Sequence, residues 1–214
     1  MCKILSLALA IFLFSGSQCL ADDIGRKIQD AYSKISSFEA TFEQKLRHRE
    51  SDTMETRKGK LLFQKPLSIR WVTEKPHEEV IVVNAREIWN YLPDEELAYI
   101  YPPDAIGDAN GIIPVVTGQA RLHEDFDVKP TGKEGGLAKI LLLPKNPTPQ
   151  LVEATIWVDE KSGLIRRAAI KDFYGNGNEV RFLSFKPGVK VPQGQFNFKA
   201  PAGVEVEDRR KNGL

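Results

Sequence analysis

The feature that most constrains the fold is an alternation of apolar and polar residues, interrupted by turn residues about every ten positions. The alternation begins in the segment Phe38-Glu39-Ala40-Thr41-Phe42. Because successive side chains of a β-strand point to opposite faces, such a segment predicts a half-buried strand. Short, evenly spaced turns favour pairing of consecutive strands as an antiparallel meander. The strands predicted in this way cover residues 38–43, 61–63, 69–73, 80–83, 88–92, 97–101, 126–128, 137–143, 151–158, 164–173, 179–186 and 196–198.

Two segments depart from the period of two and are predicted to be helical. Residues 22–35 place Ile24, Ile28 and Tyr32 at helical spacing. Residues 102–122 break the strand rhythm with prolines and an apolar run, which indicates one or two short helices. The predicted fold class is therefore α+β. A long antiparallel sheet curls strongly, and the two helical segments cover its concave side.

The first 21 residues have the pattern of a secretory signal peptide. A basic start is followed by an apolar run that is shorter than the roughly 20 residues of a transmembrane helix. Small residues place the predicted cut after Ala21, which leaves residues 22–214 as a single exported domain. The alternative is a lipoprotein signal in which Cys19 is acylated, but Gln18 stands where that signal favours a small residue.

Composition excludes several classes of function for the exported domain. Both cysteines of the chain, Cys2 and Cys19, lie in the predicted signal peptide, so neither disulfides nor thiolate chemistry is expected in residues 22–214. The formal net charge of +1 gives no global basic field for nucleic acid. The three histidines lack metal-ligand spacing, and we find no catalytic motif or phosphate-binding loop. We therefore predict no metal, no cofactor and no enzymatic activity.

The strands predicted between residues 38 and 101 are unusually rich in large apolar side chains. Nine of them fall within about 60 residues, which is the length of chain that forms a few paired strands. Two interpretations remain open: a well-packed core, or a ligand cavity in the mouth of the curled sheet. The nine residues are Phe38, Phe42, Leu61, Phe63, Ile69, Trp71, Trp89, Tyr91 and Tyr99.

Three blocks of sequence, in this order and spacing, resemble the periplasmic outer-membrane lipoprotein carrier family (LolA). The first block, residues 35–44, reads ISSFEATFEQ. The second, residues 59–71, reads GKLLFQKPLSIRW. The third, residues 196–204, reads FNFKAPAGV. The likeness extends over most of residues 24–211.

The resemblance implies an incomplete β-barrel with a helical lid over an apolar cavity that binds acyl chains. It also implies a monomeric periplasmic carrier that takes acylated lipoproteins from an inner-membrane ABC transporter to an outer-membrane receptor, without nucleic acid as a partner. The lid residues expected from it are Ile112, Ile113 and Val116. Lys65 stands where the family commonly has an arginine that holds the lid, and is the expected latch. The expected cavity residues are Phe38, Phe42, Leu61, Phe63, Ile69, Trp71, Ile81, Trp89 and Tyr91.

Two other functions stay open from the sequence. The same fold could serve as a lipid-sensing or lipoprotein-sensing regulatory domain that binds a partner protein instead of ferrying cargo. A hydrolase acting on a lipid or cell-wall substrate is the third possibility.

Overall fold

The computed structural model describes residues 16–105, 112–192 and 194–210, with side chains from residue 24 onward. Residues 1–15 of the predicted signal peptide lie outside this range. The described strands are β1 (Ser37–His48), β2 (Thr53–Gln64), β3 (Ser68–Lys75), β4 (Glu79–Val83), β5 (Ile88–Leu92), β6 (Leu97–Tyr101), β7 (Phe126–Glu134), β8 (Leu137–Pro144), β9 (Glu153–Asp159), β10 (Leu164–Lys171), β11 (Gly177–Pro187) and β12 (Glu205–Asp208).

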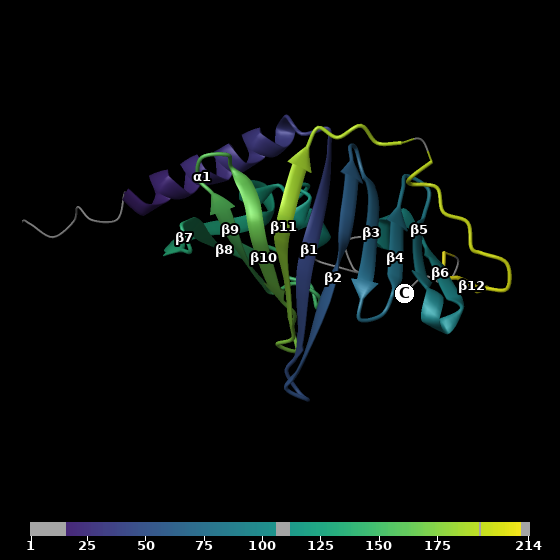
Figure 1. The fold of residues 1–214 in the computed structure, drawn as a ribbon. Helices are drawn as coiled ribbons and strands as arrows, with labels where there is room; N and C mark the ends of the chain where they lie inside the picture. Colours follow the sequence, from purple (N-terminus) through teal and green to yellow (C-terminus); the bar gives the residue numbers. More distant parts are fainter. Residues whose placement is uncertain (1–15, 106–111, 193, 211–214) are drawn as a thin grey trace, which may run out of the picture.

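These strands form one open sheet of 12 strands in the order β12-β6-β5-β4-β3-β2-β1-β11-β10-β9-β8-β7 (Figure 1). The predicted curved, incomplete barrel is confirmed, because β12 and β7 end the sheet without pairing with each other. The prediction of a purely antiparallel sheet is wrong at one edge, where β12 pairs with β6 in parallel. A parallel pair requires the chain to cross over between the strands, and residues 102–204 make that crossing.

Five helices are described, and all of them except α1 have only three or four residues. They are α1 (Gly16–Ser33), η1 (Pro93–Glu95), η2 (Pro103–Ala105), α3 (Ile113–Val116) and α4 (Leu122–Asp125). Helix α1 begins before the predicted cut after Ala21 and ends two residues before Ile35. It runs across the end of the sheet where β1 begins (Figure 1). No described helix is long and apolar enough to cross a bilayer.

Two β-bulges, each an extra residue in one strand of a pair, contribute to the curvature of the sheet. The pairing register shifts between Thr41 and Phe42 against β11, and between Lys58 and Gly59 against β3. Bulges bend a strand and increase its twist. At Gly59 a Cβ atom would lie 1.9 Å from the carbonyl oxygen of Val72, so only glycine allows this close approach of β2 and β3.

The predicted strand at residues 196–198 is wrong. Residues 194–204, which we call the C-terminal strap, cross the outer face of the sheet without joining it, and the edge strand is β12 instead. Asn84 donates a hydrogen bond to the carbonyl of Phe196 (3.1 Å), and Arg70 donates one to the carbonyl of Gln195 (3.4 Å). The backbone carbonyl groups of the strap thus accept hydrogen bonds from side chains of the sheet, and not from the backbone of a neighbouring strand. The Phe198 ring packs against Trp89 and Tyr91 of β5, so its apolar character reflects contact with the sheet and not strand pairing.

Candidate functional site

Cross-strand register brings apolar side chains of β1, β2, β3 and β4 onto the concave face. Phe38 pairs with Phe63, Phe63 with Ile69, and Ile69 with Val83. Directly opposed residues of antiparallel strands share a face, so these side chains form one row across the sheet. Seven of the nine predicted cavity residues lie on this face and are buried: Phe38, Phe42, Leu61, Phe63, Ile69, Trp71 and Ile81.

The aromatic rings on this face are packed against one another. The ring centroids of Phe42 and Trp71 lie 4.3 Å apart, and those of Phe38 and Phe63 lie 5.1 Å apart. Phe38 also stacks on Phe185 of β11 at 4.5 Å. These rings therefore form a continuous apolar wall from β11 to β3.

The prediction that Trp89 and Tyr91 line the same cavity is wrong as to their face. Ile88 pairs with Val83 on the concave side, so its neighbour Trp89 points the other way, as does Tyr91. Both rings pack against Phe198 of the C-terminal strap, at centroid distances of 5.3 and 5.4 Å. Strand β5 has large apolar residues on both faces, and alternation alone does not say which face is concave.

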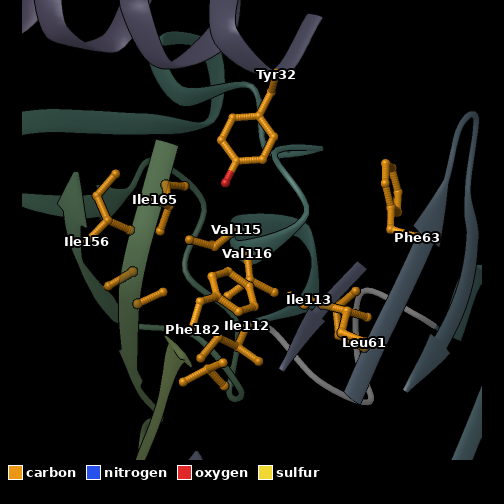
Figure 2. Packing of buried hydrophobic residues seen from close by; sticks show 14 of the residues in the cluster. Tyr32, Leu61, Phe63, Ile112, Ile113, Val115, Val116, Ile156, Ile165 and Phe182 are labelled. Carbon is orange, nitrogen blue, oxygen red and sulfur yellow. The ribbon is translucent and has the colours of Figure 1, made fainter. Parts of the chain in front are cut away.

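Helix α3 fills the concave side. Ile112, Ile113 and Val116, the predicted lid residues, are 1%, 3% and 0% exposed. Val115, which the sequence analysis missed, is also buried. Figure 2 shows these side chains between Ile156 and Ile165 of β9 and β10 on one side and Leu61 and Phe63 of β2 on the other. Three of the four residues of this short helix are buried and Pro114 is half-buried, which explains why an apolar run without amphipathic spacing is helical here.

Little space remains beneath α3. Trp71, Ile81, Ile112 and Ile113 border a cavity of about 80 Å³. Ligand pockets for small molecules usually enclose roughly 300–1,000 Å³. The interior is therefore occupied by α3 and interlocked rings, which leaves too little room for an acyl chain.

Among the described residues, this cavity opens at one end through a polar rim. Gln44 Nε2 donates to Asn178 Oδ1 at 2.9 Å, and Arg57 forms an ion pair with Glu79 at 2.9 Å. Gln44 and Arg57 lie two residues from Phe42 and Gly59, on the same inward parity. The rim was not predicted from the sequence, although polar residues at inward positions of apolar strands were the available signal.

The opposite end of the hollow is closed by the C-terminal end of α1. Tyr32 is 4% exposed, and its ring points into the interior (Figure 2). Burial raises the pKa of the Tyr32 phenol, because ionisation would place a charge in an apolar environment. The phenol therefore stays neutral over the physiological pH range.

The prediction that Lys65 holds the lid is wrong for α3, because Lys65 forms its hydrogen bonds with α1 instead. Its Nζ donates to the carbonyl oxygens of Tyr32 and Ser33, both at 2.8 Å. These carbonyls lie in the last turn of α1, where a cation is favoured by the unsatisfied carbonyl groups. Lys65 thus fastens α1 across the closed end, and α3 is held by apolar contacts.

The site offers no metal chemistry among the residues described. In that part of the chain, no three histidine, cysteine or acidic side chains are grouped so that they could hold a metal ion. What the arrangement provides is a concave apolar wall, a short apolar helix that fills it and a polar rim. Such a site can shield hydrocarbon from water.

Comparison with known proteins agrees with this geometry. Residues 33–199 match the family described as outer membrane lipoprotein carrier protein LolA. The outer-membrane lipoprotein carrier protein of Bordetella avium is 24% identical over 93% of this chain and 94% of the relative. That of Serratia proteamaculans is 26% identical over 96% and 98%.

Solved structures share the fold at low sequence identity. An uncharacterised conserved protein from Thermus thermophilus is 14% identical with a TM-score of 0.58, covering 89% of this chain and 99% of that one. The Mycobacterium tuberculosis lipoprotein LppX is 15% identical with a TM-score of 0.53, covering 82% and 100%.

Proposed function

Because this chain belongs to the LolA family of outer membrane lipoprotein carriers, we propose that it carries acylated lipoproteins through the periplasm. In this proposal it acts as a monomer that receives cargo from an inner-membrane ABC transporter and delivers it to an outer-membrane receptor. The observation that supports it most directly is the apolar helix α3 buried in an open, aromatic-lined sheet.

The physical need for such a carrier is large. Three acyl chains contain about 45 methylenes, and full exposure to water costs on the order of 35 kcal/mol at roughly 0.8 kcal/mol each. Unassisted diffusion between membranes is therefore negligible. A protein that covers a substantial part of this hydrocarbon makes crossing feasible.

Release requires that the site not bind too tightly, and α3 supplies the opposing free energy. Its four buried side chains each contribute roughly 1.5–3 kcal/mol of apolar burial. Acyl chains that enter the hollow must replace these contacts, so their net affinity is lower than their gross burial implies. In this proposal the acyl chains of the cargo replace the side chains of α3 in contact with the wall formed by the seven concave residues. The four plug residues are Ile112, Ile113, Val115 and Val116.

The test is competition for the hollow in solution. The purified protein should bind a hydrophobic fluorescent dye, and a triacylated lipoprotein should displace it. The matched control is the same lipoprotein with its acylated cysteine replaced by serine, which should displace no dye. Absence of displacement by the acylated form would overturn the proposal.

Depletion in the source cell then separates a carrier from a sensor. Loss of a carrier should leave lipoproteins in the inner membrane. An altered signalling response with normal lipoprotein distribution would instead identify a lipid-sensing regulatory domain.

A further inference from the structure

Two aromatic rings project from the turn between β10 and β11. Phe173 is 72% exposed and Tyr174 is 70% exposed. The rings meet edge to face, with centroids 5.7 Å apart and an interplanar angle of 85°. Adjacent exposed rings are unusual, because each leaves a large apolar area in water.

Hydrogen bonds hold this turn in a defined shape. The Asp172 carboxylate accepts from the backbone N–H and from the side-chain amide of Asn176, both at 2.8 Å. The N–H of Phe173 donates to the Pro149 carbonyl at 2.9 Å. Because the backbone is fixed by these bonds, the exposure of the rings is built into the turn.

The turn is also tied to the hairpin between β1 and β2. The backbone N–H of Arg49 donates to Asn176 Oδ1 at 2.9 Å. Gly175 has φ of +83°, and a Cβ there would lie 2.7 Å from Arg49 Cδ. The two tips therefore form one surface, and Tyr174 and Asn176 line an open groove with residues 48–51.

This surface lies at the open end of the hollow. Gln44 and Asn178, which form the polar rim, stand in the same two hairpins as the tips. Figure 1 shows both tips at the end of the sheet opposite α1, with the β1–β2 hairpin extending beyond the neighbouring strands. Whatever this surface meets is thus brought to the entrance of the cavity.

Apolar exposure is concentrated at this end. Five large hydrophobic side chains are exposed among the described residues, and three of them, Met54, Phe173 and Tyr174, lie within two residues of the turns that form these tips or in those turns. Leu183 and Val206 are the other two and lie in β11 and β12.

Cations without an ion-pair partner lie on the two hairpins that carry the rings. Lys45, Arg49 and Lys171 are exposed, and no carboxylate of the described chain lies within ion-pair distance of any of them. Glu50 and Asp172 also lie at the tips and Glu179 is the cross-strand partner of Lys45, so carboxylates equal these cations in number without forming ion pairs with them. Aromatic rings flanked by cations suit the headgroup layer of a bilayer, where rings enter the interface and cations meet lipid phosphates.

We infer that the hairpin-tip surface, formed by Met54, Phe173, Tyr174 and Arg49, docks the open end of the hollow on a phospholipid membrane. This inference rests on the proposed function, since the transporter and the receptor that exchange cargo with the carrier are themselves held at membrane surfaces. Docking there would place the polar rim at the membrane surface where these partners present or accept acyl chains.

Sedimentation with protein-free vesicles tests the inference. The purified protein should bind vesicles of equal parts phosphatidylcholine and phosphatidylglycerol. The double variant Phe173→Ser/Tyr174→Ser should bind at least about tenfold more weakly, because its rings no longer enter the interface. Arg49→Gln should lower the preference for phosphatidylglycerol over pure phosphatidylcholine. The matched control is Leu183→Ser, which removes an exposed apolar side chain from β11 and should leave vesicle binding unchanged.

Dye binding in solution separates this inference from the proposed function. The Phe173→Ser/Tyr174→Ser variant should retain dye binding and its displacement by acylated lipoprotein, because both rings lie outside the hollow; retention also shows that it folds. If the unaltered protein does not bind protein-free vesicles, or the double variant binds them equally well, membrane docking is refuted while the carrier proposal stands. Binding that requires a membrane protein in the vesicles would likewise refute it and identify a protein partner.

Discussion

Truncation of the α3 plug should tighten acyl binding while it weakens the fold. Val116 is 0% exposed and lies in the apolar cluster of the hollow. Val116→Ala removes two buried methyl groups, at a cost of about 2 kcal/mol to the closed state. In a loaded protein from which α3 has been displaced, those methyl groups make no such contacts. The exchange therefore shifts toward the loaded state by up to the same amount, which corresponds to an affinity gain of up to about 30-fold.

Val82 provides the matched control. It is also a valine and also 0% exposed, but it points to the outer face beside Trp89 and lies outside the apolar cluster of the hollow. Val82→Ala should lower the free energy of unfolding by a similar amount and leave acyl affinity unchanged. Urea unfolding measures stability, and titration with a fluorescent acyl probe measures affinity. Equal affinities for the two variants, or weaker binding by Val116→Ala, would refute the idea that α3 competes with the ligand.

Three further predictions concern the frame around the hollow. Lys65→Met should loosen the last turn of α1 and cost about 1 kcal/mol, whereas Lys65→Arg should retain most of that stability; hydrogen exchange of the α1 amides reports both. Phe198→Ala should uncover Trp89 and Tyr91, shift tryptophan emission to the red and leave acyl affinity unchanged, and a loss of affinity would contradict their placement on the outer face. Because the folded protein raises the pKa of Tyr32, the stability that this group contributes is fully present below the unfolded value of about 10 and declines as pH rises above it. Tyr32→Phe should remove that part of the alkaline decline, as measured by urea unfolding at a series of pH values.

The local sequence pattern was sufficient to predict which side of a strand is buried where one face is apolar and the other is polar. The alternation from Phe38 to Phe42 predicted the buried and exposed sides of β1, and Leu61, Phe63, Ile69 and the intervening turns extended the same wall. Spacing of turns also predicted most strand boundaries and a curled sheet, whereas the incomplete barrel was implied by the family resemblance. These properties follow from the two-residue period of strands, which the chain encodes within a few positions.

Long-range packing decided what local pattern left ambiguous. Trp89 and Tyr91 are as apolar as the residues of the wall, but they face outward because Phe198, far along the chain, covers them. For the same reason Phe196 and Phe198 alternate like a strand without forming one.

The amino-acid sequence by itself determined that this chain builds an apolar sheet with two helical segments to cover it. Only the tertiary structure decided that α3 occupies the hollow, that Lys65 holds α1, and that the polar rim and the ring pair meet at the open end. The physical reason is that periodicity specifies which residues share a face. Curvature and contacts between distant segments specify which face is concave, what fills it and where it opens.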